Sequence, residues 1–342
     1  MTAEVKENAG AIAVVTGATG FIGSALVDAL VRRGMRVRCL TSKRPRAGED
    51  RGDVEWHVVD WNDPRAVERS PALEDAGMVF HLAGRTKGLT LEEFRAGNVR
   101  PTEALLAALV RHGARPESFV LVSSQSASGP ANDLSVPRRE HDDPTPIDDY
   151  GRSKLEAERV VEAYGSTLPW TIVRPSSVYG PRDRDFLAMF RQLSSGVWLY
   201  PATRDRWLSI AYVNDIVQAM LVAATHPRAV GRTYFLAGEP AVTWRDVYLA
   251  AAEASGARKL LELDLPQPMV DIAGRLGDLT ARLTGRVGLV NSRKVALGRP
   301  EYWVCSTERA RQELGVECAT PLREGMRATA QWYVEQRWLK QG

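Results

Sequence analysis

The sequence contains few of the residues that build metal sites and disulfide frameworks. Its 342 residues include three cysteines, Cys39, Cys305 and Cys318, which lie far apart and show no CxxC spacing. The five histidines form no HxxxH pair. These absences argue against a disulfide framework and a structural zinc site. They predict a reducing compartment and a protein that holds no metal.

Long apolar runs and an excess of one charge are also missing. The longest apolar runs, such as residues 104–110, are too short to cross a bilayer. The first ten residues are polar and mixed in charge, unlike a secretory signal. With 45 basic and 42 acidic residues, the net charge of +3 indicates neither nucleic acid nor an acidic membrane as a partner. We therefore expect a cytoplasmic protein with a small-molecule substrate, no nucleic-acid partner and no membrane span.

The first half of the sequence alternates short apolar strands with helical patterns. The expected strands are Ile12–Thr16, Val37–Leu40, Val54–Val59, Met78–Leu82, Phe119–Val122 and Thr171–Val173. Between them, apolar residues recur on one helical face, as in Ala25, Leu26, Ala29 and Leu30. Continuous apolar strands joined by helices predict an α/β fold, with a doubly wound parallel sheet covered on both faces.

In the second half this alternation fades, and proline, aromatic and arginine residues become more frequent. Four helices are expected near Asp185–Ser194, Asn214–Ala224, Trp244–Ala254 and Val270–Leu283. Thr320 and Pro321 predict the start of a last helix, with Thr320 as N-cap and Pro321 in the first turn. The side chains expected to face inward from this helix are Leu322, Met326 and Tyr333.

The first expected strand leads into three glycines spaced three residues apart, Gly17, Gly20 and Gly23, and an amphipathic helix follows. In a dinucleotide site the first glycine permits the tight turn and the second lets the backbone approach the pyrophosphate. The third lets the helix pack against the strand. The helix N-terminus offers free N–H groups and a partial positive charge to the anion. The pattern predicts a dinucleotide site in a Rossmann fold, with a simple tight turn as the alternative.

A second motif suggests proton transfer. Tyr150 and Lys154 stand four residues apart, so a helix places them on one face. A free tyrosine has a pKa of ~10, and a nearby cation favours the phenolate and lowers that pKa. Ser123 and Ser124 end the fifth expected strand, where open α/β sheets place ligand groups, and Ser124 could hold the same substrate oxygen as Tyr150. The alternatives are a strand-end turn for the serines and a solvated helix charge for Lys154.

Together these segments resemble the extended short-chain dehydrogenase/reductase family over nearly the whole chain. The matching segments are Thr16–Gly23, Asp60, His81–Gly84, Asn98–Val99, Ser123–Ser124, Tyr150–Lys154, Arg174–Pro181, Glu313–Gly315, Leu322–Gly325 and Trp332–Tyr333. The resemblance implies a Rossmann domain and a smaller C-terminal substrate domain. We expect the first over residues 11–174, with a contribution from 205–238, and the second over 175–204 and 239–339.

The resemblance also implies roles for single residues. Tyr150 would be the acid–base residue, Lys154 would lower its pKa and hold the nicotinamide ribose, and Ser124 would orient the substrate oxygen. Asn98 would order the active-site helix or a proton-relay water, with a polar residue on a helix surface as the alternative. The residues implied in cofactor binding are Gly17, Thr19, Gly20, Phe21, Ile22, Gly23, Ser42, Lys43, Arg44, Asp60, Trp61, Leu82, Ala83, Gly84, Tyr150, Lys154, Pro175, Ser177 and Val178.

The end of the second expected strand bears on the choice between NAD and NADP. NAD enzymes usually carry an acidic residue there that bonds the ribose 2′-hydroxyl. Here Ser42, Lys43 and Arg44 follow the strand, and they could hold a 2′-phosphate by charge-assisted hydrogen bonds. We therefore predict NADP(H). The alternatives are NAD(H) as cofactor and a solvated basic loop as the role of these residues.

Three departures separate the chain from the sugar-nucleotide enzymes that it resembles. Gln125 and Ser126 stand where dehydratases carry an Asp-Glu pair. Ser177 replaces an asparagine that many such enzymes use at the diphosphate. The arginine expected before Val213–Asp215 is missing from its place, although Arg206 is close by. We predict hydride transfer between a nicotinamide and a ketone or alcohol carbon of a hydrophobic small molecule. A nucleotide-sugar epimerase or dehydratase is the alternative, and a non-catalytic NADP-binding module is a third hypothesis.

The helix expected at Val270–Leu283 bears on the substrate. Its broad apolar side consists of Val270, Ala273, Leu276, Leu279 and Leu283. We expect this side to pack into the core, with a wall over an apolar substrate as the alternative. The chain resembles the dihydroflavonol-reductase-like and hydroxysteroid-dehydrogenase-like branches, which act on hydrophobic alcohols and ketones. By the same analogy we expect a homodimer through the helices that carry Asn98 and Tyr150.

Overall fold

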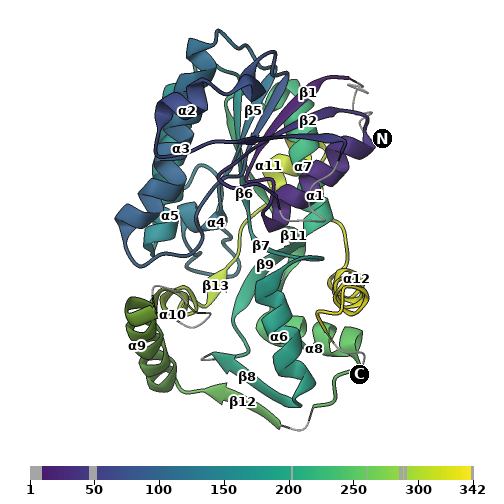
Figure 1. Cartoon of the computed structure of the whole chain (residues 1–342). Helices are drawn as coiled ribbons and strands as arrows, with labels where there is room; N and C mark the ends of the chain where they lie inside the picture. The colour runs from purple at the N-terminus through teal and green to yellow at the C-terminus, as the bar shows by residue number, and fades with distance from the viewer. Residues whose placement is uncertain are drawn as a thin grey trace.

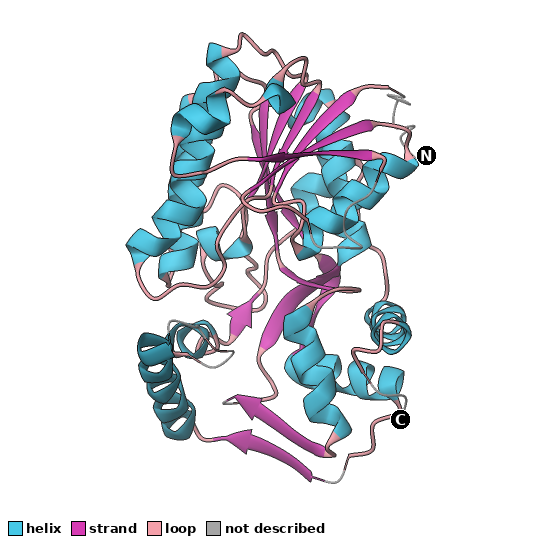
Figure 2. Ribbon diagram, in the orientation of Figure 1, coloured by secondary structure: helices cyan, strands magenta, loops and turns pink. Residues whose placement is uncertain are grey.

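The larger part of the molecule is built on one parallel sheet. The structure, a computed structural model, describes residues 10–45, 52–201, 203–259, 261–284, 288 and 291–339. Seven strands pair in the order β10-β6-β5-β4-β1-β2-β3, all parallel. They are β1 Ile12–Thr16, β2 Arg36–Thr41, β3 Val54–Val58, β4 Met78–His81, β5 Ser118–Val122, β6 Trp170–Pro175 and β10 Arg232–Leu236. Figure 2 shows helices on both faces of this sheet, which confirms the predicted fold class.

The central strands are apolar along their whole length because both of their faces are covered. In β1, Ala13 and Val15 belong to one hydrophobic cluster and Val14 to another on the opposite face. Figure 1 shows which helices cover each face. On one side are α1 Phe21–Arg32, α7 Val213–Thr225 and α11 Glu308–Leu314, and on the other are α2 Pro64–Glu68, α3 Leu91–Arg111 and α5 Asp149–Ala163.

A smaller region lies beyond the carboxyl edge of the large sheet (Figure 1). Its strands are β7 Ser177–Tyr179, β8 Val197–Pro201, β9 Trp207–Tyr212, β11 Gly238–Thr243, β12 Leu261–Leu265 and β13 Tyr302–Trp303. Its helices are α6 Arg184–Ser194, α8 Trp244–Ser255, α9 Gln267–Thr284, α10 Ser292–Leu297 and α12 Leu322–Glu335. A separate aromatic-rich cluster packs α6, α8 and α12 against β8 and β9.

The chain enters the smaller region after β6, returns to the large sheet with α7 and β10, and packs α11 on that sheet after β13. β10 lies within the 205–238 segment and pairs with β6. The division of the chain into two domains stays a prediction. Among the described residues, no helix has the length and apolar character needed to cross a membrane.

The predicted start of the last helix is wrong by one residue. α12 begins at Leu322, with Pro321 as its N-cap and no side-chain cap. The side chain of Thr320 does not cap this helix. Thr320 Oγ1 donates a hydrogen bond to Asp215 Oδ1, and its backbone N–H donates to Oδ2, both at 2.8 Å. The Thr320 side chain is therefore bonded to Asp215 of α7 and not to a backbone N–H at the start of α12. Met326 and Tyr333 are fully buried, as predicted.

The predicted burial of the apolar side of α9 is wrong for most of its residues. Val270 is buried, but Leu276 is 58% exposed, Leu279 is 52% exposed and Leu283 is 78% exposed. Ala273 is exposed as well. The helix packs on short α10 rather than on a sheet, so only a narrow face is covered.

Candidate active site

The glycine turn after β1 is built for close backbone packing. Gly17 has φ +68°, and a Cβ there would lie 2.6 Å from the backbone carbon of Leu82. A Cβ at Gly23 would lie 2.2 Å from the Gly17 oxygen. Gly20 donates its N–H to that same oxygen at 2.9 Å and precedes Phe21, where α1 begins. Side chains at the first and third glycines would therefore destroy the turn.

This turn leaves the start of α1 open to an anion. Within the described residues no side chain caps the helix, and its first turn contains no acidic residue. Thr19 and Gly20 are exposed, while Phe21 and Ile22 are half-buried. The free N–H groups and the positive end of the helix dipole lie at the carboxyl edge of the sheet, where a pyrophosphate fits.

The residues expected on the adenosine side follow β2 and β3. Ser42, Lys43 and Arg44 are exposed directly after β2, and Thr41 Oγ1 donates a hydrogen bond to the Lys43 oxygen at 2.8 Å. Asp60 is exposed beyond β3, where it accepts hydrogen bonds from the neighbouring Asn62. Trp61 packs against the cluster under α3. Among residues 42–45, the described residues that directly follow β2, two side chains are basic and none is acidic.

The segment after β4 is held by a buried polar network that the sequence did not indicate. Thr16 Oγ1 accepts hydrogen bonds from the N–H groups of Leu82 (3.1 Å) and Ala83 (2.9 Å). The two ring nitrogens of His81 lie 2.7 Å from Thr16 Oγ1 and 2.9 Å from Thr102 Oγ1. Burial lowers the pKa of His81 to about 3, so its ring is neutral at physiological pH. The network fixes the loop in front of Gly84.

Asn98 connects that loop to the helix that carries the tyrosine. Its side chain is buried, so the surface alternative is wrong. Asn98 Oδ1 accepts the N–H of Arg85 (2.7 Å), and Nδ2 donates to the Arg85 oxygen (3.2 Å) and to Ser153 Oγ (2.7 Å). Ser153 Oγ in turn donates to the backbone carbonyl oxygen of Tyr150 (2.8 Å). These contacts fix α5 relative to α3.

Lys154 lies at the centre of the site. Its Nζ donates to the Val122 oxygen at the end of β5, at 2.7 Å. A Cβ at Gly84 would lie 3.8 Å from this Nζ and 2.9 Å from Asn98 Oδ1, so glycine leaves room here for another group. Burial lowers the pKa of Lys154 to about 8, and the nearby Glu158 carboxylate opposes that shift. Lys154 is therefore a buried ammonium group and not a solvated helix charge.

Tyr150 does not have the lowered pKa that the sequence predicted. Burial raises the pKa of its phenol above the ordinary value. A side-chain hydrogen bond from Ser124 and the charge of Arg293 act in the opposite direction. Ser124 Oγ also accepts the N–H of Ser126 at 3.1 Å, at the start of α4 Gln125–Ser128. The cation that acts on the phenol is thus an arginine from the smaller region.

Arg293 is the functional candidate that sequence reasoning missed. Its guanidinium carbon lies 5.3 Å from the ring centre of Tyr150 and 5.3 Å from that of Phe94. Its Nε lies 3.2 Å from Asp148 Oδ2, and its Nη1 donates to the Thr86 oxygen at 2.6 Å. A single arginine far along the chain forms no motif, so only the fold places it here.

A buried ion pair fixes α5 against β6. Arg174 Nε and Nη2 donate to the two carboxylate oxygens of Glu158 at 3.0 and 2.6 Å, and both side chains are buried. Such a two-point contact fixes direction as well as distance. Tyr150 and Lys154 therefore stand on a helix that is fixed to the sheet.

Several buried polar atoms at the same edge lack partners among the described residues. They are Ser123 Oγ after β5, Ser176 Oγ after β6 and Gln125 Nε2 in α4. Pro175 ends β6, and Ser177 and Val178 continue into β7. Buried polar groups normally have a hydrogen-bond partner, so these orphans are suited to a polar ligand.

The fold and the site define a nicotinamide-dependent enzyme of the extended short-chain dehydrogenase/reductase type, acting on a CH–OH group or its ketone. A profile of the NAD-dependent epimerase/dehydratase family matches residues 13–237. The chain belongs to this family.

Three known proteins illustrate the range of this family. A ceramide reductase of Caulobacter vibrioides is 30% identical over 96% of this chain and 96% of its own length. A UDP-glucose 4-epimerase of Vibrio cholerae is 25% identical over 94% of this chain and 95% of its own. The solved structure of MoeE5 in complex with UDP-glucose and NAD is 25% identical over 96% of this chain and 100% of its own, with a TM-score of 0.76. Reductases and sugar epimerases thus both resemble this chain over nearly its full length.

Proposed function

We propose that this protein is an NADP(H)-dependent oxidoreductase that transfers hydride between the nicotinamide and a ketone or alcohol carbon of a hydrophobic small molecule. One observation carries the proposal. Ser124, Tyr150 and Lys154 stand together at the carboxyl edge of the sheet, and Gln125 and Ser126 follow without a carboxylate. The site can therefore move one proton at one oxygen, but it lacks the acid pair that would act on a neighbouring carbon.

The chain's own residues account for the proton and for orientation. When bound, a reduced nicotinamide would supply the hydride for the carbonyl carbon. Ser124 and Tyr150 hold the carbonyl oxygen, and Tyr150 gives it the proton that completes the alcohol. The raised pKa keeps the Tyr150 phenol protonated for this step. Lys154 would hold the nicotinamide ribose, and Asn98 keeps the helix of Tyr150 in place through Ser153.

The preference for NADP(H) rests on Lys43 and Arg44. Both are exposed after β2, at the strand end where NAD enzymes place a carboxylate. Charge-assisted hydrogen bonds to a 2′-phosphate would favour NADPH over NADH. The Lys43→Ala/Arg44→Ala double variant should bind NADPH at least tenfold more weakly and NADH unchanged, as measured by cofactor titration. Unchanged NADPH binding in that variant, or equal binding of both cofactors by the wild type, would contradict this preference.

The hydrophobic substrate class rests on two observations. Ser177 and the stretch before Val213 lack the side chains that sugar-nucleotide enzymes use at the diphosphate. The ceramide reductase relative, whose name denotes a lipid substrate, aligns with nearly the whole chain. We infer that long-chain ketones or the corresponding alcohols are the substrates.

The test is a panel of carbonyl compounds and alcohols, followed at the absorbance of the reduced nicotinamide with both cofactors. We expect turnover with long-chain ketones and none with UDP-glucose in a product analysis. Conversion of UDP-glucose without turnover of any apolar ketone would replace the proposal with the sugar epimerase alternative. That alternative is favoured by the likeness to MoeE5 and to the Vibrio cholerae epimerase. Cofactor binding without any turnover would favour the non-catalytic module.

We further propose a cytoplasmic homodimer, paired through the outer faces of α3 and α5. Arg95 and Glu156 support this by a two-point ion pair at 2.7 Å, which joins the two helices into one surface. The same proposal keeps the division into a nucleotide domain and a smaller substrate domain. Light scattering of the purified protein should give twice the chain mass of 37.7 kDa. A monomer at all concentrations would rule out the dimer.

A further inference from the structure

Helix α9 exposes a continuous apolar row. Five large apolar side chains recur at alternating spacings of three and four residues, so they share one helix face. We call these five residues the apolar stripe. They and their exposed fractions are Met269 58%, Ile272 58%, Leu276 58%, Leu279 52% and Leu283 78%. Isolated exposed apolar residues are common on soluble proteins, but a contiguous row marks an interaction surface.

The opposite face of α9 attaches the helix to the protein. Val270 and Ala281 are buried on this face. Gly274 packs so closely on α10 that a Cβ there would lie 2.9 Å from Val295 Cγ2. None of the hydrophobic clusters formed by the described residues includes a stripe residue. In Figure 1, α9 stands at the edge of the molecule, with α10 beside it on the side of β13.

The charged residues of α9 are sorted around the stripe. Arg275 and Arg282 are exposed and border it on one side. The two acidic residues lie on the same flank, next to the arginines but further from the stripe, and they bond within the protein. Asp271 contacts Arg299 at 3.2 Å, and Asp278 accepts a backbone N–H of α10 at 3.2 Å. An apolar helix face bordered by cations is complementary to a surface in which apolar chains lie beneath anionic groups.

A second copy of the helix fits this face less well. The stripe has the spacing of a coiled-coil seam, so the residues that flank it would face the partner helix. One flank carries Arg275 and Arg282, and the other carries Ala273 and Thr280. An antiparallel pair would bring two arginine flanks together, and a parallel pair would set arginines against uncharged residues. Neither arrangement forms an ion pair.

We propose that α9 lies in the surface of a bilayer that contains anionic phospholipids. Interfacial helices bury their apolar face about 5–10 Å into the boundary between headgroups and acyl chains and carry cations on the polar side. The stripe extends for roughly 20 Å along the helix axis. Leu261 and Leu263 are also exposed, at 46% and 43%, on the strand β12 that precedes α9 in the chain. The net charge of +3 did not indicate an anionic membrane as a partner, because the attraction depends on where Arg275 and Arg282 lie and not on the total charge.

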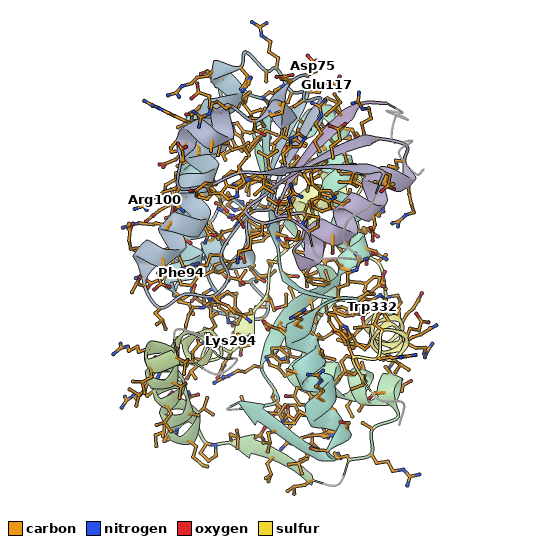
Figure 3. All side chains as sticks on the ribbon, viewed as in Figure 1. Asp75, Phe94, Arg100, Glu117, Lys294 and Trp332 are labelled. Carbon is orange, nitrogen blue, oxygen red and sulfur yellow. The ribbon has the colours of Figure 1, made fainter. Side chains whose placement is uncertain are left out.

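Docking through α9 would bring the active site close to the bilayer. α10 packs on α9, carries Arg293 to the ring of Tyr150 and contacts α6 through Lys294 and Asp185 at 3.1 Å. Figure 3 labels Phe94 and Lys294 on the two sides of this junction. A hydrophobic ketone would then reach Tyr150 from the membrane. This access rests on the proposed function, whereas the docking of α9 does not.

Docking is tested by flotation of the purified chain with vesicles of phosphatidylcholine alone and of phosphatidylcholine with phosphatidylglycerol. The wild type should float with the anionic vesicles and less so at high salt. The Leu276→Glu/Leu279→Glu variant should lose at least tenfold in binding. The Arg275→Gln/Arg282→Gln variant should lose about fivefold for each arginine. Val230→Glu/Leu249→Glu, which changes two apolar residues elsewhere that are 51% and 41% exposed, should bind like the wild type.

Three results would overturn the proposal. The first is no flotation with either kind of vesicle. The second is equal flotation of the wild type and Leu276→Glu/Leu279→Glu. The third is a dimer in sedimentation that Leu276→Glu/Leu279→Glu dissociates, because a second copy would then cover the stripe. Turnover of a long-chain ketone in detergent, measured without vesicles, serves as the separate readout. Its absence beside intact flotation contradicts the proposed reaction alone.

Discussion

Helices α3 and α9 are both long and amphipathic, but the apolar face of α3 is buried and most of the apolar face of α9 is exposed. α3 buries Ala104, Leu105 and Leu109 against the large sheet. α9 leaves Leu276 and Leu279 more than half exposed. The difference lies in what each helix packs on, because a seven-stranded sheet covers a broad face whereas a six-residue helix covers a narrow one. An amphipathic pattern therefore predicts a helix and an apolar face, but not what covers that face.

The same contrast holds for polar groups. On the α3 side, the site is built from buried groups that bond one another, as Asn98 and Ser153 do. The α9–α10 side contributes a single arginine, Arg293, which reaches across to Tyr150. We infer that the first region holds the chemistry and that the second adjusts it and presents the substrate.

The largest expected effect sharpens this division. Tyr150→Phe removes the proton donor and should lower kcat by about 10²–10⁴-fold, the range that general acid–base groups contribute. Cofactor affinity should stay the same, because the helix and Lys154 are untouched. Steady-state kinetics and a cofactor titration measure both quantities. Near-normal turnover in this variant would remove Tyr150 from the mechanism.

A second comparison uses one ion pair from each region. Glu158→Gln leaves the buried Arg174 without its counter-charge and should lower the free energy of unfolding by about 3–5 kcal/mol. Asp271→Asn breaks the contact with Arg299 on the surface of α9 and should leave the unfolding midpoint unchanged. Denaturant titrations measure both variants. Equal destabilisation would break the contrast between the two regions.

The third prediction tests the two apolar faces directly. Leu105→Ala opens a cavity under α3 and should cost roughly 2–5 kcal/mol of unfolding free energy. Leu276→Ala removes an exposed side chain and should stay within about 0.5 kcal/mol of the wild type. The same denaturant titrations apply. A large loss in Leu276→Ala would mean that the stripe is covered within the free protein.

The smallest effect concerns the arginine that joins the regions. Reduction needs protonated Tyr150, so its rate falls as the pH rises through the pKa of the phenol. The charge of Arg293 lowers that pKa. Arg293→Ala should therefore raise the pKa and move the alkaline limb of the rate profile to higher pH. Arg293→Lys keeps a cation and should leave the limb in place, and a shift in both variants would point to a structural role.

The residue pattern could predict the large sheet and its helices because the motifs that specify them are short segments of the sequence. The strand–Gly17–helix unit, Ser124 two residues beyond the end of β5 and the Tyr150–Lys154 spacing each lie within a few residues. The strands of the smaller region escaped prediction because their pairing joins distant segments, as in β8 with β12 and β9 with β13. The Thr320 cap failed for the same reason, since Asp215 from another helix took its place.

The sequence by itself predicted the α/β fold, which the structure confirms. It also gave grounds to propose the dinucleotide turn and the roles of Ser124, Tyr150 and Lys154, because each proposal follows from spacing along a short segment. Only the tertiary structure decided the direction of the Tyr150 pKa shift, the approach of Arg293 and the exposure of the apolar stripe. Each of these depends on burial and on charges contributed by segments that are distant in the sequence, and a local residue pattern contains no information about such contacts.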